Sequence, residues 1–295
     1  MLHSRRATAR TQQMLGKGES ELFAEGQAPC VVAFHGFGGT AAELLPLLRR
    51  IAQTGYAVDA ALLPGHGTRA EDLQDLTFEQ WVSAGMARTH DAIAKYGSAV
   101  LVGFSLGSLV AMQIAADLSG SGGSDGDRMA GLVVLGNALR LRPHASVPLG
   151  IASLLGLRLP DVYLLKSIAA DLVDKEVLST LVTYDRHPLR AALEVYRGGQ
   201  RVRREVARIR CPTLVLHGRK DLVCSWRNAS WLSARIGSRD VRVRFFENSA
   251  HVIACDGERT EVASEVIGFL RKVRSRLASG RDGSPDVADA WREGR

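Results

Sequence analysis

Residues 98–110 read SAVLVGFSLGSLV, and this stretch decides the class of fold to which the chain is assigned. Its first half is a continuous apolar run, typical of a strand buried on both faces of a parallel sheet. Its second half has the pattern of a helix, and the motif G-x-S-x-G lies between them, from Gly103 to Gly107. A strand that turns sharply into a helix exposes the central serine close to the positive end of that helix. The pattern therefore predicts that Ser105 is a nucleophile, although Gly- and Ser-rich loops without chemistry can contain the same motif.

The rest of the chain alternates short apolar runs with longer helical patterns. This is typical of an α/β protein with a mostly parallel sheet flanked by helices. The expected strands cover residues 29–34, 56–63, 99–104, 131–135, 213–217 and 241–246, with an edge strand near residues 19–24. The expected helices cover residues 41–54, 77–96, 106–118 and 258–277, and residues 119–127 are expected to form a surface loop.

The alternation stops between residues 139 and 210. This part contains apolar pieces but no β-α rhythm, so we expect a mainly helical cap inserted into the core. Such an insertion would cover the strand ends where doubly wound sheets bind ligands. The expected organisation is a core of residues 19–138 and 211–277, a cap of residues 139–210, and disordered arms at residues 1–18 and 278–295.

The composition is that of an ordinary globular protein, with 46% hydrophobic and 23% charged residues. No apolar run approaches the roughly 18–20 residues that span a bilayer, so we expect no stable membrane insertion. The net charge is +7, and residues 1–18 hold four basic residues and no acidic ones. The remaining excess is too small to demand a nucleic-acid partner. The Arg-rich N-terminal arm is expected to be a disordered tail, with an organelle-targeting segment as the alternative.

The four cysteines are scattered and include no C-x-x-C pair, so the sequence predicts neither a metal site nor a disulfide framework. A reducing, cytoplasmic location is the corresponding expectation. The arginines between residues 197 and 210 are expected to form the solvated face of a connecting helix rather than a phosphate-binding patch. The oligomeric state is left open by the sequence.

A serine hydroxyl becomes a nucleophile when a positioned base removes its proton, and that base is usually histidine. Among the eight histidines, His251 lies in the turn between the last expected strand and the last expected helix. Asp221 follows the strand at residues 213–217 after a glycine and a short loop, so its carboxylate could accept the Nδ1–H group of the histidine. The alternatives are an ordinary surface histidine and a turn-forming aspartate.

An oxyanion hole requires two backbone N–H groups near the substrate carbonyl. One should come from Leu106, the residue after the serine, and the other from the loop HGFGG at residues 35–39. The glycines of this loop let the backbone approach closely, so Phe37 is the expected second donor. His35 and His66 are expected to brace their loops rather than to react.

Five motifs in order, HGFGG, LPGHG, GFSLG, HGRKD and NSAHVIACDGER, resemble those of the serine carboxylesterases and monoacylglycerol lipases of the α/β-hydrolase superfamily. The resemblance covers about residues 29–277 and is weakest in the insertion. It implies an α/β-hydrolase fold, with Ser105 as nucleophile, Asp221 as acid and His251 as base. It also implies oxyanion donors at Phe37 and Leu106, and no metal or organic cofactor.

The expected function is that of a serine hydrolase that cleaves carboxylic esters through an acyl-enzyme. The apolar insertion favours a small hydrophobic ester substrate with an apolar acyl chain. The same residues could instead serve a thioesterase, a lysophospholipase or an acyltransferase. A non-catalytic ligand- or partner-binding module is the alternative from another class.

Overall fold

A computed structural model describes residues 20–120, 124–156, 159–165, 172–174, 176–177 and 181–279. The arm expected at residues 1–18 lies outside the described residues, and so does the expected tail from residue 280 onward. Residues 278–279 of that tail are described, and they form the end of the last helix.

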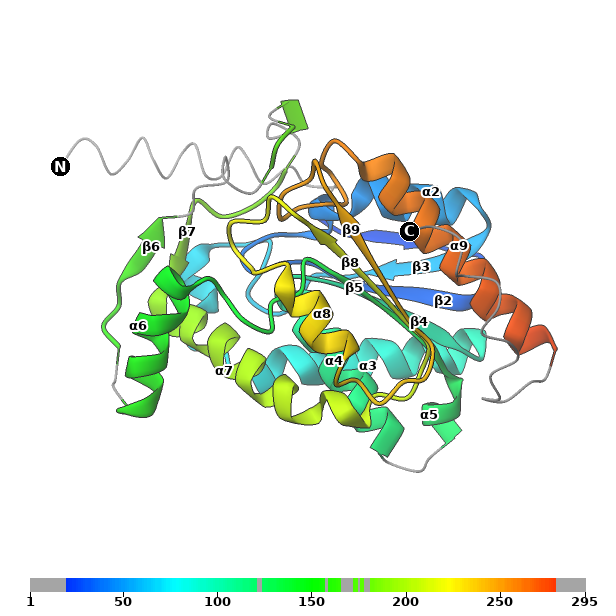
Figure 1. Ribbon diagram of the computed structural model, residues 1–295, viewed down its shortest axis with the longest axis horizontal. Helices are drawn as coiled ribbons and strands as arrows, with labels where there is room; N and C mark the ends of the chain where they lie inside the picture. The colour runs from blue at the N-terminus through cyan, green and yellow to red at the C-terminus, as the bar shows by residue number, and fades with distance from the viewer. Residues whose placement is uncertain are drawn as a thin grey trace.

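A seven-stranded sheet forms the centre of the protein (Figure 1). Its strands are, in chain order, β1 (Leu22–Ala24), β2 (Gln27–Phe34), β3 (Tyr56–Ala60), β4 (Ala99–Phe104), β5 (Met129–Leu135), β8 (Thr213–Gly218) and β9 (Val241–Phe246). Their spatial order is β1-β3-β2-β4-β5-β8-β9, and only the pair of β1 and β3 is antiparallel. The mostly parallel sheet expected from the sequence is confirmed.

Helices cover both faces of this sheet (Figure 1). On one face, α2 (Leu45–Gln53) packs against α9 (Arg259–Ala278). The other face carries α3 (Phe78–Tyr96), α4 (Leu106–Gly120) and α8 (Arg227–Ser233). All six residues of β4 and all seven of β5 are buried as a result. Burial on both faces explains why these strands are continuous apolar runs in the sequence.

Helix α3 illustrates how local sequence determines the ends of an element. At its start, the Thr77 side chain accepts the Gln80 N–H and the Gln80 side chain accepts the Thr77 N–H, a reciprocal capping box. At its end, Gly97 adopts a φ of 81°, which a glycine tolerates without steric cost. The buried face between these ends includes Phe78 and Trp81. Among the described residues, no helix combines the length and the apolar character needed to cross a membrane.

The described residues between β5 and β8 include two α-helices and a small two-stranded ribbon. These elements are α6 (Pro143–Leu154), β6 (Tyr163–Leu165), β7 (Arg186–Pro188) and α7 (Leu189–Glu205). The antiparallel ribbon of β6 and β7 was not expected from the sequence. Each strand has three residues, too few for a hydrophobic period to be visible. Helix α7 packs against α3 and α4, so this end of the insertion joins the helical layer of the core (Figure 1).

Several expected boundaries differ in the structure. Strands β2 and β5 each begin two residues earlier than expected, at Gln27 and Met129, and the helix expected at residues 41–54 is divided into a 3-10 turn (Ala41–Glu43) and α2. Strand β3 ends at Ala60 rather than at residue 63, because the amides of Leu62 and Leu63 bind the side chains of Glu21 and His35 instead of a neighbouring strand. The expected loop at residues 119–127 contains the end of α4 and a short helix, α5 (Ser124–Arg128), which packs on α4. Residues 121–123 of this loop lie outside the described residues.

The junction of β4 and α4 brings backbones unusually close together. A Cβ atom at Gly107 would clash with the carbonyl oxygen of Phe34, and one at Gly103 would clash with the carbonyl oxygen of Gly107. These clashes involve main-chain atoms, which cannot move aside as a flexible side chain does. Both glycines of the motif are therefore required by packing.

We predict that Gly107→Ala lowers the free energy of unfolding by at least about 2 kcal/mol, because the added methyl group displaces β2 from α4. Urea unfolding followed by circular dichroism measures this change. Gly268→Ala in α9 is the control, since a Cβ atom there meets no neighbour within 4 Å. The control should raise stability by about 0.5–1 kcal/mol. Equal effects of the two substitutions would contradict the packing argument.

Candidate active site

Ser105 lies at the corner between β4 and α4 with a φ of 53°. It has the only positive φ found at a non-glycine position among the described residues. Such a conformation costs about 1–3 kcal/mol and persists only when neighbouring contacts impose it. Those contacts are backbone hydrogen bonds, from Ser105 N–H to Leu135 O at 3.1 Å and from Gly107 N–H to His35 O at 3.1 Å.

His251 is the residue that faces the Ser105 hydroxyl. It lies in the loop between β9 and α9, and its ring is buried. Its Nε2 atom is 3.0 Å from Ser105 Oγ, and its Nδ1 atom is 2.7 Å from Asp221 Oδ2. Because a carboxylate oxygen accepts, Nδ1 carries the proton and Nε2 is left to accept the serine hydroxyl. The structure thus brings these three residues into one chain of hydrogen bonds.

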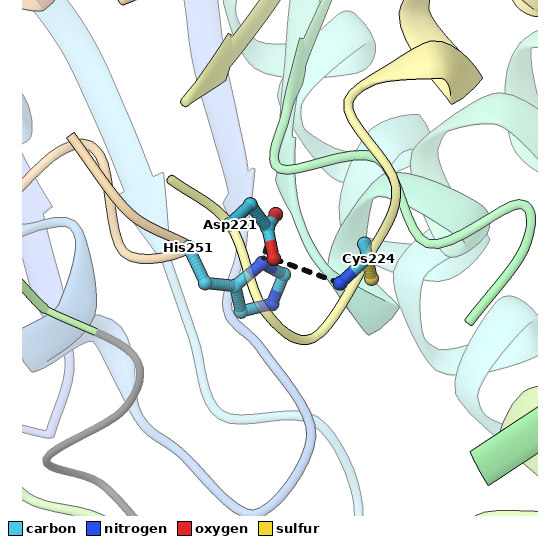
Figure 2. Close-up of side chains that lie close together, drawn as sticks. All are labelled: Asp221, Cys224 and His251. Atoms are coloured by element: carbon cyan, nitrogen blue, oxygen red, sulfur yellow. Dashed lines mark hydrogen bonds and ion pairs between the residues drawn. The ribbon is translucent and has the colours of Figure 1, made fainter. Parts of the chain in front are cut away.

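Asp221 is fully buried in the loop after β8. Figure 2 shows its carboxylate between the ring of His251 and the backbone of Cys224. Its Oδ1 atom accepts the N–H groups of Val223 and Cys224, each at 2.8 Å. Burial alone would favour the neutral acid, but the electrostatic interaction with the His251 ring and hydrogen bonds from His217 and His251 outweigh it. The pKa of Asp221 is therefore held well below its usual range.

The Asp221 carboxylate has a second histidine partner that the sequence reasoning missed. His217, at the end of β8, is fully buried, and its Nε2 atom lies 2.9 Å from Asp221 Oδ2. The signal in the sequence was a histidine four residues before the candidate acid. A spacing of four residues across a strand end does not show that the two side chains point toward one another. Their contact depends on the turn between His217 and Asp221, whose conformation is set in the folded protein.

The loop at residues 35–39 lies beside the Ser105 corner through the Gly107–His35 bond. His35 Nε2 accepts the Leu63 N–H at 3.0 Å and its Nδ1 atom donates to Gly36 O at 2.9 Å, so it braces the loop as expected. Burial lowers the pKa of His35 to about 4, which keeps the ring neutral at pH 7. Phe37, in the middle of this loop, stacks on His187 of β7 with ring centroids 4.4 Å apart.

Asp221, Cys224 and His251 also form a cluster of ligand-type side chains, each offering one atom within 4.8 Å of the others (Figure 2). Asp221 Oδ2 is already bonded to two histidines, and Oδ1 to two backbone N–H groups. These bonds occupy the lone pairs that a cation would use. The contacts favour a carboxylate that orients a histidine.

Comparisons with known proteins give consistent results. The family model described as serine aminopeptidase, S33, matches residues 27–258. The thermostable monoacylglycerol lipase of Bacillus sp. (strain H-257) is 27% identical over 256 residues, which cover 86% of this chain and 95% of that protein. The carboxylesterase of Bacillus subtilis (strain 168) is 22% identical over 250 residues, covering 84% of this chain and 95% of that protein.

Solved structures show the same fold. A structure from the work on the metagenome-derived lipolytic enzymes LipS and LipT matches with a TM-score of 0.76 and 24% identity, covering 87% of this chain and 98% of that one. The monoacylglycerol lipase of Paleococcus ferrophilus matches with a TM-score of 0.71 and 22% identity, covering 85% and 97%. The α/β-hydrolase fold implied by the sequence motifs is confirmed.

The depressed pKa of Asp221 has a consequence for stability. Because the folded state favours the ionised carboxylate, Asp221 stabilises the folded protein at pH values above the pKa of an unfolded aspartate, about 3.9. This stabilisation is lost as the pH falls below that value toward the lower pKa of the folded state. We predict that Asp221→Asn is less stable than the unaltered protein at pH 7, and that the gap narrows below about pH 4.

Urea unfolding between pH 3 and pH 7 measures this gap. Asp161→Asn is the control, because Asp161 is 61% exposed in its ion pair with Arg190. That exposed pair should contribute less than about 1 kcal/mol at any pH. A gap for Asp221→Asn that stays constant down to pH 3 would contradict the assignment of a depressed pKa.

Proposed function

This chain belongs to the serine aminopeptidase, S33 family, and within that family we propose that it hydrolyses carboxylic esters with an apolar acyl chain. The observation that carries the proposal is the continuous set of hydrogen bonds from Ser105 through His251 to Asp221, with 3.0 Å and 2.7 Å between the bonded atoms. The curated relatives are lipases and esterases, which supports ester rather than peptide substrates. The protein is thus a carboxylic ester hydrolase of the lipase and esterase type.

The proposed reaction proceeds through an acyl-enzyme. His251 takes the proton of the Ser105 hydroxyl while Ser105 Oγ attacks the ester carbonyl carbon, which forms a tetrahedral oxyanion. The N–H groups of Phe37 and Leu106 stabilise this oxyanion. The bond to the alcohol breaks, and His251 gives its proton to the leaving oxygen. His251 then takes a proton from a water, whose oxygen attacks the acyl carbon; the bond to Ser105 Oγ breaks, His251 returns the proton to Ser105, and the acid is released.

Apolar side chains exposed on the insertion support an apolar substrate. Several residues of α6, β6 and the chain next to them are about half exposed or more: Val147, Ile151, Leu154, Leu155, Leu164 and Leu165. The insertion also contacts the loop of Phe37 through His187, so it lies next to the candidate oxyanion donors. We propose that residues 139–210 act as a cap over the site, with the acyl chain beneath it.

The proposal retains the other expectations from the sequence. All four cysteines are buried and carry thiols rather than disulfides, which supports a reducing, cytoplasmic setting. In α7, Arg197 pairs with Glu194 and Arg201 with Glu79, which supports the solvated helix face expected for these arginines. A thioesterase, a lysophospholipase, an acyltransferase and a non-catalytic binding module are the alternatives that the substrate tests must separate.

We predict that the protein hydrolyses p-nitrophenyl esters and monoacylglycerols of short to medium chain length. Ser105→Ala should lower kcat by at least about 10³-fold, because the nucleophile is removed while the fold is kept. Steady-state kinetics and circular dichroism measure these effects. Ser264→Ala, which removes an exposed hydroxyl of α9, is the matched control and should keep full activity.

A fluorophosphonate probe gives an independent measurement, since it labels only an activated serine. Labelling should map to Ser105 and should disappear in Ser105→Ala. No turnover of esters, thioesters, lysophospholipids or aminoacyl p-nitroanilides, together with no labelling, would overturn the hydrolase proposal and favour a binding module. Faster turnover of one of the other substrate classes would reassign the substrate and keep the nucleophile.

A further inference from the structure

A buried carboxylate outside the Ser105, Asp221 and His251 set joins two distant parts of the chain. Asp256 lies five residues after His251 and is fully buried. Its Oδ2 atom accepts the Ala250 N–H at 2.7 Å, and its Oδ1 atom accepts the Asp174 N–H at 2.8 Å. Further N–H groups bind it from Val173, at 3.1 Å to either oxygen, and from Gly257, at 2.9 Å. Two of its donors therefore belong to the insertion.

A carboxylate is unfavourable in the protein interior unless hydrogen bonds replace its hydration, so the surroundings of Asp256 are a specific feature of the fold. Burying a carboxylate loses several kcal/mol of hydration unless nearly all of its lone pairs find donors. Four backbone N–H groups provide them here, in the short, charge-assisted bonds that carboxylates form best. Arg259 ties the same segments together again, since its Nη1 atom lies 2.9 Å from Asp174 Oδ2 and donates to Asp256 O at 3.1 Å.

One end of this link reaches the candidate base directly. Ala250 immediately precedes His251, so the bond to its N–H determines where the backbone of His251 lies. The other end is anchored in the core, because Leu172, next to Val173, is buried and belongs to the same hydrophobic cluster as residues of α9 and β8. The Asp256 carboxylate thus links the His251 loop to the insertion, and Arg259 adds a second link between the same segments.

We infer that Asp256 is a positioning residue that sets His251 against Ser105 and makes this placement depend on the attachment of Val173 and Asp174. The inference rests on the proposed function, in which His251 is the base. Proton transfer requires the His251 Nε2 to stay within hydrogen-bond reach of Ser105 Oγ, and a misplacement of about 1 Å can cost on the order of 10²-fold in rate.

Asp256→Asn is the first test. The amide has the same shape, but its nitrogen cannot accept N–H groups. In either orientation, one side of the link is lost: the Ala250 bond, or the bonds to Asp174 and Gly257. We predict that kcat falls about 10- to 100-fold while KM changes less than about threefold, because the base is displaced and the substrate pocket is not. The rate of fluorophosphonate labelling should fall in parallel.

A pair of substitutions at Asp174 separates positioning from stability. Asp174→Pro removes the N–H that Asp256 accepts. Asp174→Ala keeps it and removes the part-exposed ion pair with Arg259 and the hydrogen bond that Asp174 Oδ1 accepts from the Glu176 N–H. We predict that Asp174→Pro lowers kcat about tenfold or more and that Asp174→Ala stays within about twofold. Thermal unfolding and circular dichroism show whether each variant is folded.

The outcomes separate this inference from the proposed function. If Asp256→Asn is folded and keeps kcat within twofold, or if the two Asp174 variants lose equal activity, the positioning role is overturned. If Asp256→Asn does not fold, the Asp174 pair decides the question alone. If the unaltered protein turns over no ester, the proposed function fails, and the labelling rates of Ser105 in the same variants still test whether Asp256 positions the histidine.

Discussion

The close contact between the start of α4 and the end of β2 is the constraint on which the site depends. Gly107 donates to His35 O, and no side chain fits between the two backbones. This contact holds Ser105 in its left-handed conformation and at the same time places the loop of Phe37 beside it. The nucleophile and the proposed oxyanion loop are therefore not two independent features; a displacement of either one moves the other.

The parallel sheet brings the remaining groups to the same edge. Asp221 follows β8 and His251 follows β9, which are hydrogen-bonded neighbours in register up to Gly218 and Phe246. The short turn after β8 directs the Asp221 carboxylate toward two histidines, and their hydrogen bonds offset the cost of burying it. A buried, ionised carboxylate of this kind holds an imidazole in one tautomer and one orientation. The electrostatics of the site thus follow from strand order and turn length.

The insertion contacts both the loop of Phe37 and the loop of His251. Toward the loop of Phe37, the Gly38 carbonyl accepts the Tyr184 N–H at 2.8 Å and the Thr183 hydroxyl at 2.9 Å. Toward the loop of His251, Val173 and Asp174 bind Asp256. A loop that is held by buried hydrogen bonds also moves less than a free surface lid.

The sequence by itself determined the α/β-hydrolase fold and the order in which Ser105, Asp221 and His251 occur along it. Strands that are buried on both faces are continuous apolar runs, and the turn at Ser105 requires glycines at a fixed spacing. Both patterns can therefore be recognised in the amino-acid sequence. The catalytic roles of the three residues stay predictions. Only the tertiary structure decided that His217 faces Asp221, that β6 pairs with β7, and that Asp256 links the insertion to the His251 loop. These contacts depend on the conformation of a turn, or they join residues about 80 positions apart in the chain. A local sequence pattern does not show which distant backbone groups a buried side chain will contact.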